Sequence, residues 1–159
     1  MSFQSFQSLA SSQLRFGFFM FLKLPSAFFS GVRLRKITEA EAVVSVPYKW
    51  FSQNPFNSTY FACQAMAAEM STGVLALGQL YKRKPPVSML VTGLKAQYFK
   101  KANERLYFTC SMGNEIKLAI EKAIATKIGQ GIDVVSTGRT AGGEIASEFV
   151  ITWSFKAKG

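Results

Sequence analysis

One stretch of the chain, residues 54–80, has a hydrophobic pattern that leaves no polar face. After an Asn-Pro-Phe-Asn turn, Ser58 and Thr59 are suited to cap the first free N–H groups of a helix. Residues 60–80 are then mostly Ala, Met, Leu and Cys. A helix that is apolar all round is normally buried on all sides. The pattern therefore predicts a buried central helix about 30 Å long.

The segments on either side of this helix alternate between apolar and polar positions, as strands do. Residues 32–48 alternate around a short turn and predict a hairpin of two strands. Further elements follow the central helix: strands at 87–99, 105–112, 132–137 and 144–156, and an amphipathic helix at 115–127. We expect strands 87–99 and 105–112 to pair with each other. An antiparallel sheet curled around one long helix, an α+β fold, accounts for this order.

The N-terminal region is rich in phenylalanine. Its uninterrupted apolar run, residues 16–22, is closed by Lys23 and is far shorter than the ~20 residues of a membrane span. A secretory signal begins with a basic region, but the first charge here is Arg15. We favour an amphipathic helix over residues 14–30, packed on the domain and ended or kinked by Pro25, with a membrane-surface anchor as the alternative. Residues 1–13 show no clear period, and we expect a flexible N-terminus there.

Composition excludes several kinds of chemistry. The 159 residues suit one domain with a core of its own. The chain has no histidine, which excludes Ser-His-Asp and Cys-His catalysis and His-ligated metals. Cys63 and Cys110 lie in apolar stretches without the spacing of a metal site. They are typical of reduced core thiols, so we expect a cytoplasmic protein without a bound metal.

The net charge of +10 has several explanations. It fits nucleic acid, an acidic membrane or a phosphate-bearing small molecule such as coenzyme A. The cations are dispersed, with Lys82, Arg83 and Lys84 as the one run of three, and no nucleic-acid motif accompanies them. We therefore do not expect nucleic acid as the partner, and the short apolar run at residues 16–22 leaves membrane association as the less favoured alternative.

Glu69 is the one charge on the central helix. Burying a lone carboxylate as an anion costs several kcal/mol unless it is hydrogen-bonded, solvated or protonated. Two interpretations follow: a functional carboxylate at a cleft, or a structural acid held by a backbone or tyrosine donor. The pattern alone does not choose between them.

With these residues, the plan resembles the hotdog fold. Within that fold it resembles the acyl-CoA thioesterases of the phenylacetate-pathway type, and more closely a branch of thioesterase-like proteins of unknown function. The likeness covers residues 14–157, and the segments EIKLAIEKAIATKIG and GEIASEFVITWSFK carry the second resemblance. It implies a single hotdog domain over residues 14–159 that assembles as a homodimer or homotetramer.

The resemblance also implies a site. In the thioesterases an Asn precedes a turn, His-Gly-Gly opens the central helix, and an Asp or Glu follows nine positions after the His. Glu69 matches the acid and Asn54 the Asn, whereas Tyr60, Phe61 and Ala62 stand where the family has His-Gly-Gly. The resemblance thus implies Glu69 as base or nucleophile, Asn54 as its catalytic partner, and a Phe61 or Ala62 amide as oxyanion donor at a dimer interface.

Five further residues are candidate substrate contacts. Tyr60 and Thr72 lie on the central helix, whereas Arg139, Lys82 and Lys84 offer charge to coenzyme A phosphates, with plain solvation as the alternative. The implied function is hydrolysis of an acyl-CoA or acyl-carrier thioester, with no cofactor beyond the coenzyme A of the substrate. The alternatives are a hotdog protein that binds an acyl-CoA or fatty-acyl group without turnover, and a basic module that binds membranes through its Phe-rich N-terminus.

Overall fold

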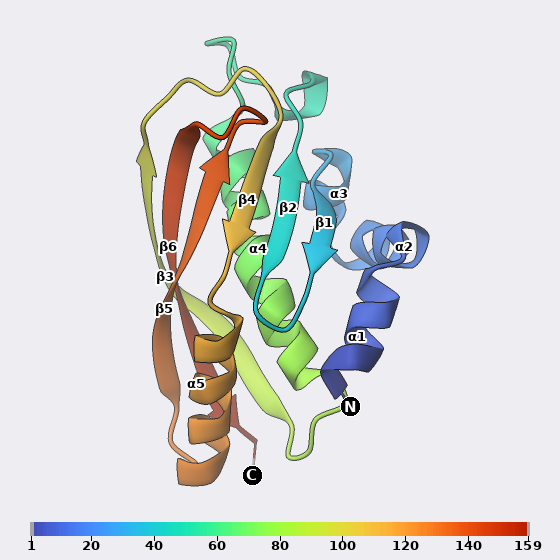
Figure 1. The fold of residues 1–159 in the computed structure, drawn as a ribbon, viewed down its shortest axis with the longest axis vertical. Helices are drawn as coiled ribbons and strands as arrows, with labels where there is room; N and C mark the ends of the chain where they lie inside the picture. The colour runs from blue at the N-terminus through green and yellow to red at the C-terminus, as the bar shows by residue number, and fades with distance from the viewer. Residues whose placement is uncertain (1, 159) are drawn as a thin grey trace.

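The computed structural model describes residues 2–158, and in it one antiparallel sheet wraps around a long helix (Figure 1). The strands are β1 (Arg33–Ile37), β2 (Ala42–Val46), β3 (Val87–Tyr98), β4 (Leu106–Cys110), β5 (Gln130–Arg139) and β6 (Ile145–Ala157). The helices are α1 (Ser2–Ala10), α2 (Gln13–Lys23), α3 (Pro25–Phe29), the 3-10 turn η1 (Trp50–Ser52), α4 (Phe61–Leu80) and α5 (Gly113–Thr126). The predicted α+β architecture is confirmed.

Helix α4 is buried as its composition predicts. Ala67, Ala68, Leu75 and Ala76 have no exposed surface, and the small side chains let the sheet come close on several sides. Figure 1 shows β2 and β4 in front of α4, the N-terminal helices beside β1, and α5 beneath β4. The predicted hairpin at 32–48 and the amphipathic helix at 115–127 are both present.

The predicted pairing of strands 87–99 and 105–112 is wrong. The order across the sheet is β1-β2-β4-β5-β6-β3, so β3 pairs with β6 at one edge, and β4 lies between β2 and β5. The reason lies in the connection between β3 and β4, because the amide of Thr59 donates to the carbonyl of Ala102 over 2.6 Å. This bond ties the connection to the start of α4 and carries the chain across the sheet. Strands β3 and β4 follow each other in sequence but are therefore not neighbours in the sheet.

The predicted helix cap is also wrong. Helix α4 begins after Tyr60, which has extended backbone angles and makes no side-chain capping bond. Thr59 instead belongs to the chain segment that crosses the helix end, paired with Gln53 through an isolated bridge. Because the local turn is part of the tertiary structure, its hydroxyl residues do not act as simple caps.

The expectation that residues 1–13 have no pattern with which to pack is wrong for α1. Phe3 and Phe6 are buried, and the ring of Phe3 occupies the space that a Cβ at Gly78 of α4 would need. Gln7 adds a hydrogen bond from its Nε2 to the carbonyl of Ile37, 2.9 Å away. The period is hard to see in the sequence because α1 has only nine residues, and three buried side chains, Phe3, Phe6 and Ala10, make up its apolar face. The flexibility expected of this segment stays a prediction.

Replacing Phe3 with Ala tests whether α1 is part of the packed core. We expect a loss of about 3 kcal/mol in the free energy of unfolding, because the ring leaves a cavity above Gly78. Phe18→Ala is the matched control, since that side chain is 63% exposed and its loss should change stability by less than about 0.5 kcal/mol. Urea denaturation measures both. Equal, small effects would show that α1 does not contribute to the core.

Candidate active site

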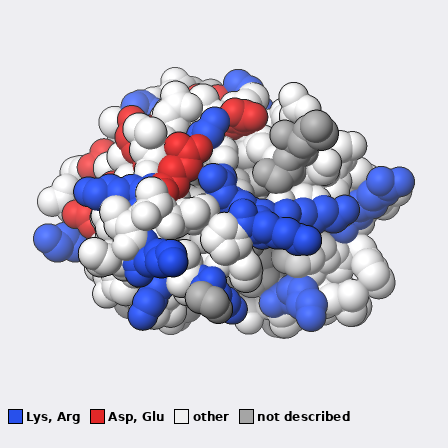
Figure 2. Space-filling view, turned by 90° about the horizontal axis from the view of Figure 1, so that it is seen from below, with Lys and Arg blue, Asp and Glu red and all other residues white. Residues whose placement is uncertain are grey.

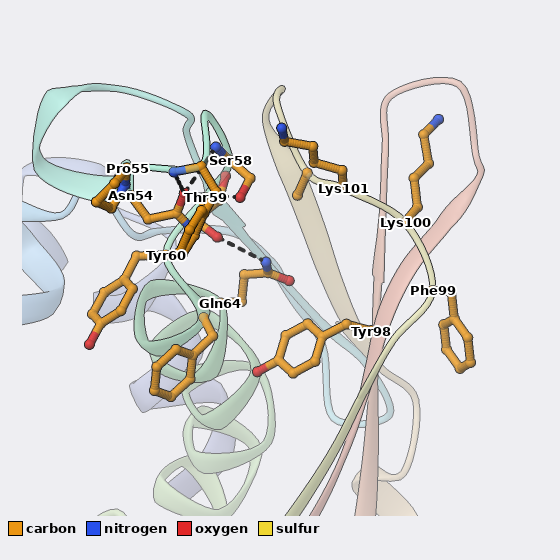
Figure 3. Close-up of a pocket in the computed structure, with 13 residues that line it drawn as sticks. Asn54, Pro55, Ser58, Thr59, Tyr60, Gln64, Tyr98, Phe99, Lys100 and Lys101 are labelled. Carbon is orange, nitrogen blue, oxygen red and sulfur yellow. Dashed lines mark hydrogen bonds between the residues drawn. The ribbon is translucent and has the colours of Figure 1, made fainter.

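A cleft of about 590 Å³ opens at the start of α4 (Figure 3). One wall is the turn before the helix and the first turn of the helix, and the other is the end of β3 with the connection that follows it. In Figure 3 the Tyr98 ring and the Gln64 side chain lie toward each other, whereas Lys100 and Lys101 extend toward the upper rim. The lining residues are Asn54, Pro55, Phe56, Ser58, Thr59, Tyr60, Phe61, Gln64, Tyr98, Phe99, Lys100, Lys101 and Ala102. Three predicted site residues, Asn54, Tyr60 and Phe61, therefore meet in one place.

Asn54 organises the turn. Its Oδ1 accepts hydrogen bonds from the amide of Phe56 at 2.9 Å and from the amide and hydroxyl of Ser58 at 3.2 and 3.1 Å. This pattern is an Asx turn, in which a side-chain carbonyl replaces a backbone acceptor. The acceptor atom of Asn54 is thus engaged by its own loop, whereas its Nδ2 makes no hydrogen bond within the described residues.

The start of α4 leaves backbone donors free. The amides of Cys63 and Gln64 donate to the carbonyl of Tyr60, but within residues 2–158 those of Phe61 and Ala62 have no acceptor. The hydroxyl of Thr59, 2% exposed, also has no partner there. Free N–H groups and the positive end of the helix dipole make this end of α4 suited to a developing negative charge.

Gln64 is a site residue that the sequence pattern did not reveal. It is buried, its Oε1 accepts from the Ser147 hydroxyl at 2.8 Å, and its Nε2 donates to the carbonyl of Thr59 at 3.3 Å. The side chain therefore ties β6 to the turn before α4 and holds the cleft wall in place. The sequence did contain a signal for this residue: Gln64 is a polar side chain in a mainly apolar helix, one turn after the helix begins.

Glu69 lies apart from this cleft, eight residues and about 12 Å further along α4. It faces a second hollow, between α4 and the junction of α2 with α3, beside Lys23, Leu24 and Met70. Within the described residues its carboxylate has no hydrogen bond and no ion pair. Burial raises the pKa of this half-buried group above its ordinary value. One of the two interpretations was a structural acid held by a nearby backbone or tyrosine donor. Among residues 2–158, no such donor contacts the Glu69 carboxylate.

The hollow beside Glu69 continues as an apolar groove. A cavity of about 170 Å³ next to Glu69 and one of about 400 Å³ nearer the end of α4 share the side chains of Phe16, Phe19 and Leu77. The second cavity ends at Tyr81 and Lys82, and α1 and α2 form its far wall. One continuous surface of apolar side chains therefore runs from the carboxylate along α4.

The other candidates occupy separate places. The Thr72 hydroxyl accepts from the Trp153 indole at 2.8 Å and donates to the Glu69 carbonyl at 2.8 Å, so it holds the core together. Arg139 ends β5 and donates to the carbonyl of Gly143 across the hairpin. Lys84 is exposed beyond the end of α4. The structure does not bring these three residues to the cleft at the helix start.

The two cysteines are buried free thiols, as predicted. Burial raises the pKa of Cys110 to about 11 and also raises that of Cys63. Both thiols are therefore protonated at neutral pH, which makes them poor nucleophiles.

Sequence comparison gives a family. Residues 14–154 match the family described as Domain of unknown function (DUF4442). The chain belongs to this family. No curated protein matches the chain.

Several solved structures share the fold. A probable thioesterase of unknown function from Pseudomonas aeruginosa superimposes with a TM-score of 0.74 at 14% identity, covering 98% of this chain and 95% of that one. A protein of unknown function from Chlorobaculum tepidum superimposes with a TM-score of 0.77 at 14% identity, covering 92% of this chain and 94% of that one. A thioesterase from Haemophilus influenzae superimposes with a TM-score of 0.65 at 11% identity, covering 92% of this chain and 91% of that one. The protein therefore shares the hotdog fold of these structures.

Replacing Glu69 with Gln tests the burial of the carboxylate. Because the pKa of Glu69 is raised in the folded state, the folded protein binds this proton more tightly, and its stability falls as pH rises from the unfolded pKa through the folded pKa. Glu69→Gln removes this penalty, so its melting temperature should exceed that of the wild type at neutral pH. The two should converge below about pH 4.

Glu104→Gln is the control, because it makes the same change at an exposed carboxylate and leaves Glu69 in place. Thermal melts of all three proteins across this pH range provide the comparison. A Glu69→Gln protein less stable than wild type at neutral pH would mean that the carboxylate has a favourable partner in solution.

Proposed function

We propose that the protein hydrolyses an acyl thioester, carried by coenzyme A or by a carrier protein, at a site formed by two chains. The observation that carries the proposal is the Glu69 carboxylate, which is half-buried, without a partner within the described residues, and placed where an apolar groove begins. A base with a raised pKa suits the activation of water at neutral pH.

The second catalytic element is the start of α4. The free amides of Phe61 and Ala62 point out of the helix end, where they donate to the oxyanion that forms when a thioester carbonyl is attacked. A backbone donor does not depend on side-chain identity. The replacement of His-Gly-Gly by Tyr60, Phe61 and Ala62 therefore leaves this function available.

The reaction follows from these two elements. The Glu69 carboxylate takes a proton from water as the water oxygen attacks the carbonyl carbon, and the carbonyl electrons move onto the oxygen held by the amides. When the carbonyl re-forms, the C–S bond breaks, and the leaving thiolate takes the proton from Glu69. Direct attack by the carboxylate, followed by hydrolysis of the resulting anhydride, uses the same residues.

Two chains are required because one helix cannot present both elements to one carbonyl. Glu69 and the Phe61 amide are about 12 Å apart along the same helix and face different hollows. Strand β3 supports assembly with a second copy, since it is twelve residues long and lies at the sheet edge, paired with β6 on one side. A long open edge is a surface for pairing with another chain.

The groove beyond Glu69 suits an apolar acyl group as the part of the substrate that it binds. From Glu69 to Leu80 the groove follows α4 for about 16 Å. An extended chain advances roughly 1.2 Å per bond, so the groove holds about a dozen carbon atoms. Its walls are mainly Phe and Leu side chains, which offer no hydrogen bonds and favour an unbranched hydrocarbon.

A second candidate function is acyl-CoA binding without turnover. The observation that favours it is Phe61, whose bulky side chain stands where the thioesterases have glycine and lines the cleft. A side chain there restricts close approach of a carbonyl to the helix start. The groove would then hold an acyl chain whose thioester remains intact.

Turnover by Glu69→Gln separates these functions. Single-turnover assays with acyl-CoA substrates of short, medium and long chains should show hydrolysis by the wild type. Glu69→Gln should lower the rate at least ~100-fold because it removes the base while the protein stays folded. A wild type that binds these thioesters but leaves them intact would favour the binding protein. Unchanged turnover in the variant would end the catalytic role of Glu69.

A mixed dimer tests whether the site is shared. Phe61→Pro removes one free amide at the first helical position, where proline is well tolerated, and Tyr60 already has the backbone angles that precede proline. The hydrolysis rate of either homodimer, Phe61→Pro or Glu69→Gln, should fall ~100-fold or more. A purified heterodimer of the two should recover about half of the wild-type rate, because one of its two symmetric sites is intact.

Phe61→Ala is the control, since it removes the ring and keeps the amide. It should keep wild-type turnover or exceed it if the ring obstructs the substrate. A heterodimer no more active than its parents would place the whole site within one chain.

A further inference from the structure

Helix α2 has a second apolar face, directed away from the protein. Leu14, Phe18, Phe21 and Leu22 are 88, 63, 46 and 56% exposed. At 100° per residue they fall within an arc of about 100°, the width of an apolar stripe. Phe16 and Met20 on the opposite side are buried in the core, whereas the exposed four lie outside it, with Phe21 contacting Phe28 and Phe29 of α3. We call these four residues the outer face of α2.

Aromatic rings extend this surface toward η1. Phe21 contacts Phe29, Phe29 contacts Phe51, and Phe51 contacts Trp50, with ring centroids 6.0, 6.1 and 4.8 Å apart. Trp50 is 76% exposed. Contiguous apolar surfaces of this kind are uncommon on proteins that bind nothing there. The outer face of α2 and these rings therefore form one surface that requires a partner.

The exposed charges on α2 and beside Trp50 are all positive. The first 38 residues contain five Lys or Arg and no Asp or Glu. Arg15 and Lys23 of α2 are exposed, and so is Lys49 beside Trp50. In the view from below, Asp and Glu gather toward the left, away from the side on which α1 and α2 lie in Figure 1 (Figure 2). An anionic partner complements this distribution, whereas a cationic one does not.

A second copy of the chain is a poor partner for this surface. A two-fold contact places the same patch on both sides, so Arg15, which borders the outer face, would meet its own copy, and α2 carries no acidic residue to pair with it. Like charges in contact oppose association. A lipid surface supplies both an apolar layer for the phenylalanines and anionic headgroups for the cations.

We propose that the outer face of α2 docks on the surface of an anionic lipid bilayer. The helix lies along the membrane with its phenylalanines at the depth of the headgroups, and Trp50 lies at the border. No helix within residues 2–158 is long and apolar enough to cross a membrane, so the contact is a surface one. The proposal does not depend on thioester hydrolysis, because none of the four residues of the outer face lines either hollow of the candidate site; of the three cations named above, Lys23 alone borders the hollow beside Glu69.

Vesicle flotation tests the proposal. The full chain is mixed with vesicles of phosphatidylcholine alone or of phosphatidylcholine with phosphatidylglycerol, and we expect binding to the anionic vesicles. Phe18→Ser with Phe21→Ser should weaken that binding about tenfold or more, because two exposed aromatic side chains no longer enter the lipid. Arg15→Gln with Lys23→Gln should weaken it less and reduce its sensitivity to salt.

Leu118→Ser with Ile128→Ser is the matched control. These apolar side chains are 65 and 67% exposed on and just after α5, far from α2 in sequence, and their loss should leave binding unchanged. Trp50 gives an independent readout, since Trp153 is buried and a blue shift of emission on adding anionic vesicles reports Trp50 entering lipid. Unchanged melting temperatures show that the variants are folded.

Three results would overturn the proposal. The first is a wild type that stays unbound with anionic vesicles. The second is an equal loss of binding in the control pair, which would mean that any exposed apolar side chain suffices. The third is a Phe18→Ser, Phe21→Ser protein that binds vesicles as the wild type does but forms a smaller oligomer by light scattering, which would make this surface an interface between copies.

Discussion

The burial of α4 on nearly all its faces is the constraint on which the rest of the structure depends. A single flat sheet covers one side of a helix, so the six strands must curl, and α1, α2 and α5 close the remaining gaps. Small side chains along α4 allow this close approach, as at Gly78, where Phe3 fills the space of a missing Cβ. Polar side chains that are buried on α4, such as Gln64 and Thr72, are held by hydrogen bonds. The Glu69 carboxylate and the free amides at the helix start instead lie at the two hollows of the candidate site, where the cover of α4 is incomplete.

The same constraint explains the chemistry proposed for Glu69. Apart from Lys23, its surroundings are mainly apolar because α4 is built for burial, and this burial raises the pKa of the carboxylate. The free amides at the other hollow follow from a different cause. The start of α4 is crossed by the connection from β3 to β4, which bonds to Thr59, and the amides of Phe61 and Ala62 have no acceptor within the described residues. Base and oxyanion donors are thus separated along one rigid helix, which is why a shared site suits this protein.

Helix α2 shows how one amphipathic pattern serves two surfaces. Its inward side completes the core beside β1 and forms a wall of the apolar groove, whereas the outer face carries exposed phenylalanines. A purely structural helix would place polar residues on its outer side, because exposed aromatic side chains gain nothing from water. The two sides of the helix therefore have different roles. Phe16 and Met20 on the inner side stabilise the fold, and Phe18 and Phe21 on the outer face remain available for a partner.

The sequence by itself determined the elements and one chemical group. The unbroken apolar pattern of residues 60–80, the strand alternation and the isolated Glu69 are local properties, and each predicted a feature that the structure contains. The tertiary structure decided which strands are neighbours, that Thr59 does not cap α4, and that Gln64 and Tyr98 share a cleft with Asn54. It also placed Glu69 in a different hollow. These outcomes depend on contacts between residues far apart in the chain, such as Thr59 with Ala102 and Gln64 with Ser147. Periodicity carries no information on such contacts, because it records only which face of an element is apolar and not what covers that face.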